Sequence, residues 1–114
     1  MKDKKKINTI IKKYFNFFSN KDLYNLNLNF SQSITLRDWT TSIKGKKNVL
    51  NFYKNIFNKF KKIKIKLNLI LYNNNLNICS CKITVYLDNL KLNVIDLIYL
   101  DKSYKIKKIE AYKI

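Results

Sequence analysis

The sequence has no proline, no histidine, one glycine and two cysteines among its 114 residues. Without histidine, a single chain with two thiols cannot supply the four nitrogen and sulfur ligands of a usual zinc site. Cys79 and Cys81 are two residues apart in a stretch typical of a β-strand, so their Cα atoms would be about 7 Å apart, too far for a comfortable disulfide. We therefore expect buried free thiols, and a protein that needs no metal and no cofactor.

Long apolar runs are also missing, and no stretch is long enough to cross a bilayer. Residues 1–6, four of which are lysine, are followed by apolar ones and look superficially like a signal peptide. However, Lys12 and Lys13 interrupt the apolar part and no small-residue cleavage site follows. We therefore predict a cytoplasmic protein with no membrane partner. The length is that of one domain spanning residues 1–114, with no second domain.

Acidic residues are scarce, with 7 of them against 24 basic residues, which gives a formal net charge of +17. Such a charge suggests a partner rich in phosphate, because bound lysine and arginine release counterions from nucleic acid. Nucleic-acid surfaces usually use arginine, however, and Arg37 is the only arginine here. The chain is also rich in Lys, Asn, Ile, Tyr and Phe, which AT-rich codons encode. We interpret the charge as compositional and keep a basic nucleic-acid binder as a third hypothesis.

Apolar residues spaced by three and four predict three helices. The first covers about residues 7–18, with Ile7, Ile10, Ile11, Tyr14, Phe15 and Phe18 along one stripe. Asp22 is expected to cap a second, short helix that carries Leu23, Leu26 and Phe30. Gly45 marks a turn into the third helix. We expect the buried side of that helix to hold Val49, Phe52, Tyr53, Ile56, Phe57 and Phe60.

The period changes to two from residue 61 onward, which predicts β-strands. In the first of these strands, the apolar face that packs on the core should hold Ile63, Ile65, Leu67, Leu69 and Leu71. Turns are expected at residues 73–75, 88–89 and 101–103, between further strands at about residues 76–87, 90–100 and 104–112. A shorter strand is expected at residues 34–38. Helices followed by a four-stranded meander imply an α+β fold with helices covering one face of the sheet.

Three polar side chains lie where the pattern calls for apolar ones. Tyr14 lies in the stripe of the first helix, and Asp38 and Asp96 each lie on the apolar face of a predicted strand. A carboxylate among apolar groups loses hydration, so its pKa rises unless charges or hydrogen bonds compensate. Two such acids together with a phenol predict a functional site.

The succession of segments along the chain resembles the nuclear-transport-factor-2-like superfamily, and more closely its SnoaL-like and ketosteroid-isomerase-like members. The segments are residues 10–15, 20–23, 34–39, 43–46, 49–53, 94–96 and 106–113, in order and without large gaps. The resemblance implies a cone-shaped, cystatin-like fold. In this fold three N-terminal helices pack on a strongly curved, mainly antiparallel sheet that encloses a pocket. It also suggests a homodimer formed through the open face of the sheet, which the pattern makes unusually apolar.

In ketosteroid isomerases a tyrosine on the first helix and a protonated aspartic acid on a later strand hold the substrate oxyanion, while a second aspartate shuttles a proton between two carbons. By this resemblance Tyr14 and Asp96 would be the donors and Asp38 the base, which must remain ionised. We also expect Trp39, Phe18 and Phe57 to line the pocket. Trp39 stands where these enzymes commonly have proline, and it could stack on a ligand or fill part of the pocket.

Two main hypotheses follow. The first is a small-molecule-binding protein that acts on an apolar carbonyl compound, as an isomerase or a cyclase-like lyase. The second is a ligand-binding or interaction module of the same fold without turnover. The structural alternatives are that Tyr14 is an ordinary core aromatic, that Asp38 caps the next loop or pairs with Lys44, and that Asp96 is hydrogen-bonded to Tyr14.

Overall fold

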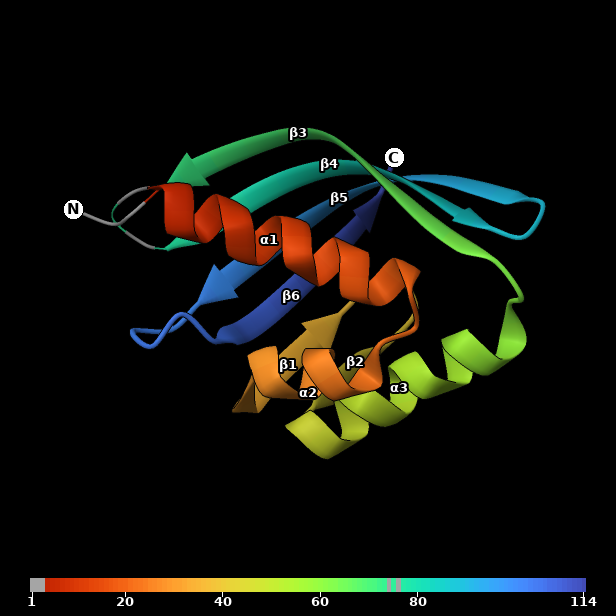
Figure 1. Cartoon of the computed structure of the whole chain (residues 1–114), viewed down its shortest axis with the longest axis horizontal. Helices are drawn as coiled ribbons and strands as arrows, with labels where there is room; N and C mark the ends of the chain where they lie inside the picture. The colour runs from red at the N-terminus through yellow and green to blue at the C-terminus, as the bar shows by residue number, and fades with distance from the viewer. Residues whose placement is uncertain (1–3, 74, 76) are drawn as a thin grey trace.

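The computed structural model describes residues 4–73, 75 and 77–114. In these residues, three helices cover the concave side of a six-stranded curved sheet (Figure 1). The elements in chain order are α1 (Lys4–Ser19), α2 (Leu23–Asn29), β1 (Phe30–Arg37), β2 (Ser42–Lys44), α3 (Lys46–Lys59), β3 (Ile63–Asn73), β4 (Ile78–Leu87), β5 (Leu90–Leu100) and β6 (Ile106–Lys113). The predicted α+β class is therefore confirmed.

The strands lie in the order β2-β1-β6-β5-β4-β3. Strands β3 to β6 form the predicted antiparallel meander. The sequence did not indicate that β1 pairs in parallel with β6, with Leu36 opposite Ile109, nor that β2 pairs with β1 at the edge. The parallel pair matters for the site because it places the residues that follow β1 beside the end of the last strand (Figure 1).

The helix ends follow the local signals in the sequence. The Asp22 carboxylate caps α2 by accepting a hydrogen bond of 3.1 Å from the backbone N–H of Asn25, as predicted. Gly45 precedes α3 with φ of 90°, a conformation that glycine adopts at little cost. Phe30 was expected on the second helix but begins β1 in an extended conformation, so this strand starts four residues before the predicted one.

One β-bulge contradicts the predicted face of β3. The register shifts between Leu67, which lies opposite Ile83, and Leu69, which lies opposite Lys82. An extra residue in one strand reverses the alternation of side chains beyond it. Leu69 and Leu71 are therefore 49% and 58% exposed on the outer face, instead of lying with Ile63, Ile65 and Leu67 on the inner one.

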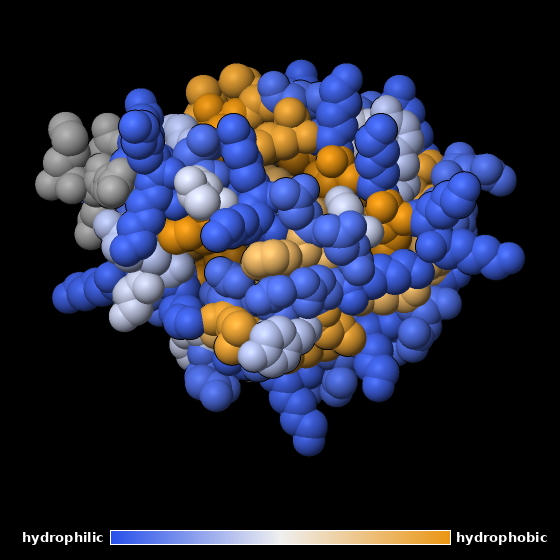
Figure 2. All heavy atoms as spheres, in the orientation of Figure 1, coloured by the Kyte–Doolittle hydropathy of each residue, from blue (hydrophilic) through white to orange (hydrophobic). Residues whose placement is uncertain are grey.

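The core fills the space between the inner face of the sheet and the helices. Cys79 and Cys81 lie in it as buried free thiols, as predicted, and burial raises the pKa of the Cys79 thiol to about 11. Hydrophilic side chains are spread across the whole face seen in Figure 2 rather than gathered in one stripe. None of the helices formed by the described residues has the length and hydropathy that a membrane span needs.

Candidate functional site

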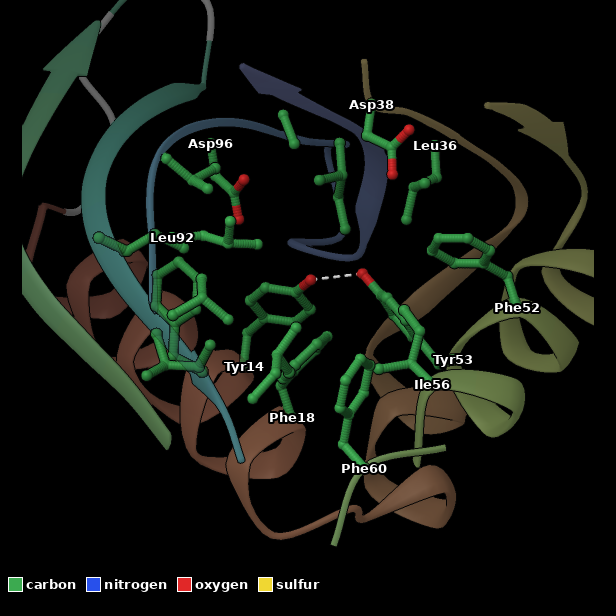
Figure 3. Close-up of a pocket in the computed structure, with 18 of the residues that line it drawn as sticks. Tyr14, Phe18, Leu36, Asp38, Phe52, Tyr53, Ile56, Phe60, Leu92 and Asp96 are labelled. Carbon is green, nitrogen blue, oxygen red and sulfur yellow. Dashed lines mark hydrogen bonds between the residues drawn. The ribbon is translucent and has the colours of Figure 1, made fainter. Parts of the chain in front are cut away.

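A cavity of about 170 Å³ lies between the concave face of the sheet, α1 and α3. Its walls are mostly aliphatic and aromatic side chains. Among the residues that the structure describes, four bring oxygen atoms into the lining: Tyr14, Asp38, Tyr53 and Asp96 (Figure 3). The three polar residues that the sequence singled out therefore line one cavity, and a second tyrosine joins them.

The two tyrosines form a hydrogen-bonded pair across the helices. The hydroxyl of Tyr14 on α1 lies 2.5 Å from that of Tyr53 on α3, and both residues are buried (Figure 3). Burial is the main reason that the pKa of each hydroxyl is raised, and the nearby Asp96 adds to the rise. Both groups therefore keep their protons at neutral pH. One hydroxyl donates to the other, which leaves one O–H proton of the pair for a ligand.

Asp96 lies on the inner face of β5 and is 7% exposed. In the described part of the chain no group forms a hydrogen bond with its carboxyl, and the Tyr14 hydroxyl bonds to Tyr53 instead. The alternative that Asp96 is a structural partner of Tyr14 is therefore wrong. Burial raises the pKa of Asp96 to about 7. A substantial fraction of this carboxyl is protonated at neutral pH, so it can donate a hydrogen bond into the cavity.

Asp38 follows β1 directly and has two different oxygens. Its Oδ1 accepts hydrogen bonds from the backbone N–H groups of Thr40 and Thr41, both at 2.8 Å, and from the Thr40 hydroxyl at 3.1 Å. It thus caps the loop, as one of the alternatives predicted, whereas no ion pair joins it to Lys44 within the described ranges. Its Oδ2 has no hydrogen-bond partner among the described residues. The cap holds the carboxyl in place while leaving one oxygen free at the cavity.

Ala111 on β6 separates the two acids. Asp96 on β5 lies directly opposite Ala111. On the other side of β6, Arg37 on β1 pairs in parallel with Glu110. The residues that follow this pair, Asp38 and Ala111, therefore also lie side by side. Neighbouring strands are about 4.8 Å apart, which places the backbones of the two acids about 10 Å apart across β6. Ala111 also lines the cavity, and its methyl group leaves the space between the carboxyl groups open. Figure 3 shows the two acids on one side of the cavity, facing the tyrosine pair.

No family model matches the sequence. No curated protein matches it either. Solved structures do match. SalBIII, an epoxide hydrolase/cyclase-like enzyme with a role in pyran ring formation in salinomycin, superposes with a TM-score of 0.87 at 15% identity, over 99% of this chain and 94% of that one. A SnoaL-like protein of unknown function from Burkholderia thailandensis superposes with a TM-score of 0.86 at 7% identity, over 98% of this chain and 97% of that one. A candidate ketosteroid isomerase from Kribbella flavida superposes with a TM-score of 0.82 at 9% identity, over 96% of this chain and 78% of that one.

Further matches are described as NTF2-like, SnoaL-like and cystatin-like. The chain has the nuclear-transport-factor-2-like fold. The fold that this resemblance implies is thus confirmed. At these identities the likeness shows the fold alone, and the same fold can carry different activities. The chemistry of this nuclear-transport-factor-2-like cavity must therefore be argued from its own residues.

The remaining predicted lining residues have different outcomes. Phe18 and Trp39 line the cavity, and Trp39 is 45% exposed at its edge. Phe57 was expected in the lining but lies in the core behind it, where its ring stacks on Tyr53 and meets Phe18 edge-on. Phe57 lies one helical turn beyond Tyr53 on the same face of α3, so Tyr53 and Phe18, which both line the cavity, cover its ring.

Among the lining residues that the sequence analysis missed, two matter most for the chemistry of the site, Tyr53 and Ala111. Tyr53 was placed in the apolar stripe of the third helix, and its polar tip among apolar neighbours was the same signal that singled out Tyr14. Ala111 carried no signal, because nothing in the sequence shows that it lies between two acids. Its place depends on the parallel pairing of β1 with β6.

Proposed function

We propose that this protein binds a small, mostly apolar carbonyl compound in the cavity and moves a proton at the carbon next to the carbonyl. The observation that carries the proposal is the Asp96 carboxyl. It is buried, it faces an apolar cavity, and it lacks a hydrogen-bond partner in the part of the chain that the structure describes. The carboxyl reaches the cavity, so a ligand oxygen that enters can accept a hydrogen bond from its protonated form.

The proposed step needs no co-reactant. The carbonyl oxygen accepts hydrogen bonds from neutral Asp96 and from the free O–H of the tyrosine pair. Oδ2 of Asp38 takes the proton from the adjacent carbon, and the electron pair of that C–H bond forms a C=C bond. The π electrons of the carbonyl move to its oxygen, where donors in a dry pocket stabilise the charge more than water does. The proton then returns from Asp38 to the same carbon, or to a conjugated one, which gives exchange or isomerisation.

The competing function is a binding module without turnover. It is favoured by the three hydrogen bonds that Oδ1 of Asp38 accepts, since capping a loop is a sufficient structural reason for an aspartate at this position. Both functions use the same cavity and the same donors. They differ in whether Asp38 exchanges a proton with the ligand.

Proton exchange of 4-methylcyclohexanone in D₂O, followed by NMR, separates the two functions. We expect exchange above the buffer rate, and we expect Asp38→Asn to lower it by about 100-fold or more, the usual contribution of a general base. Asp101→Asn is the matched control, because Asp101 also caps a turn, through the backbone N–H groups of Ser103 and Lys105, but does not line the cavity. Equal rates in Asp38→Asn and the parent protein would leave only the binding module.

A further inference from the structure

A lysine lies at the mouth of the cavity. The ammonium group of Lys113 is 5.6 Å from the ring centroid of Trp39, which belongs to the lining. Lys113 follows Ile109 and Ala111 at alternate positions of β6, and both of these line the cavity, so Lys113 shares the concave face with them. No carboxylate pairs with Lys113 in residues 4–73, 75 and 77–114. The mouth therefore carries an un-neutralised cation above an aromatic ring.

The sheet sets the spacing of the strand positions that carry this cation and the buried acid. Ala111 lies opposite Asp96, and Lys113 lies opposite Val94. Two residues along a strand span about 7 Å between their Cα atoms, a spacing comparable to one six-membered ring with a substituent at each end. The flexible Lys113 side chain can adjust the position of its ammonium group to such a ligand. The wall at this level is apolar, formed by Val94 and Leu92 together with the ring of Trp39. The site thus has a polar end, an apolar middle of one ring length, and a cationic end.

The size of the cavity agrees with this length. An apolar protein cavity of about 150 Å³ holds one benzene molecule, and the cavity here is about 170 Å³. Aromatic side chains close its sides, namely Phe18, Phe52 and Phe60. A second fused ring would require these half-buried side chains to move, which costs packing energy. The space therefore favours a single ring.

We propose that the ligand of this site is a single-ring ketone with a carboxylate on the far side of the ring from the carbonyl. The carbonyl lies between Asp96 and the tyrosine pair, the ring packs against Trp39 and Val94, and the carboxylate binds Lys113. The carbonyl end rests on the function proposed above, whereas the carboxylate end rests on Lys113 alone. The positive charge of the whole chain also draws an anionic ligand toward the surface before it enters.

Titration calorimetry with three probes tests this inference: 4-oxocyclohexanecarboxylate, the neutral 4-methylcyclohexanone, and the two-ring 2-decalone. The carboxylate probe should bind about fivefold more tightly than the neutral one, the factor expected for an ion pair open to water. Lys113→Met keeps most of the apolar stem and should abolish that preference, so that the two single-ring probes bind with equal affinity. Lys82→Met is the matched control, because Lys82 is an exposed lysine on the outer face, opposite Ile95.

The outcomes are separable from those of the exchange experiment. Equal loss of the preference in Lys82→Met and Lys113→Met would mean general attraction to a basic surface, and would overturn the inference. Tighter binding of 2-decalone than of 4-methylcyclohexanone, or no binding of any probe, would also overturn it. If the charge and size preferences are found but no variant or parent protein exchanges protons, the ligand class stands and the proposed catalysis fails.

Discussion

The hydroxyl of Tyr14 lies 2.5 Å from the hydroxyl of Tyr53, although 39 residues separate them in the chain. This bond joins α1 to α3 at the floor of an apolar cavity and leaves one phenolic proton for a further partner. Both residues are almost wholly buried, so each hydroxyl relies on the other for a hydrogen bond within the protein. The pair thus links the packing of the helices to the chemistry of the site.

Replacing either tyrosine by phenylalanine should leave the other hydroxyl buried without its partner. We expect Tyr14→Phe and Tyr53→Phe each to lower the free energy of unfolding by about 1–3 kcal/mol, measured by urea denaturation. The double variant should lose less than the sum of the two single losses, because it leaves no orphan hydroxyl. Additive losses would show that the two hydroxyls do not interact.

Asp96 should make the protein less stable as the pH rises from about 4 to about 7. Burial raises the pKa of Asp96 from its ordinary value of 3.8 to about 7 in the folded state. The folded state therefore keeps a proton that the unfolded chain has already lost. The stability present below pH 3.8 is lost as the pH rises through about 7. The loss is about 4 kcal/mol, at about 1.4 kcal/mol for each pKa unit.

Asp96→Asn should remove this pH dependence, because the amide does not titrate. The measurement is the difference in unfolding free energy between the parent protein and the variant at several pH values, which cancels the other titrating groups. Asp101→Asn, in an exposed turn, serves as the control and should keep the parent profile. A constant difference between parent and Asp96→Asn from pH 4 to pH 8 would contradict the raised pKa.

Ala111→Leu should fill the space between the two acids. We expect the affinity for 4-methylcyclohexanone to fall more than tenfold, while the melting temperature is unchanged or higher because the new side chain enters an existing cavity. Calorimetry and thermal unfolding measure the two effects. Unchanged affinity would mean that the ligand does not lie over Ala111.

The outer face of the sheet should mediate a homodimer. Leu69 and Leu71 are 49% and 58% exposed there, and exposed apolar patches on a sheet commonly mark an interface. Light scattering of the parent protein at micromolar concentration should give the mass of a dimer. The double variant Leu69→Thr, Leu71→Thr should give that of a monomer, and Leu90→Thr, at an exposed leucine beside the β4–β5 turn, should not. A monomeric parent protein would contradict the prediction.

Local patterns in the sequence predict much of the architecture. The stripe of the first helix, the Asp22 cap, the turn at Gly45 and the strand Leu90–Leu100 all lie where spacing and turn residues place them. Each depends on residues close together in the chain, whose preferences survive folding. Local spacing also predicted that Tyr14, Asp38 and Asp96 belong to the site, because each is a polar group that interrupts an apolar pattern.

The sequence by itself thus determined which residues form each element and which polar groups break the pattern. The tertiary structure alone decided that Tyr53 pairs with Tyr14, that β1 lies beside β6 so that Ala111 separates two acids, and that the bulge in β3 turns Leu69 outward. These features arise from contacts between segments far apart in the chain. Local spacing carries no information about such contacts, because the packing of the whole core selects them.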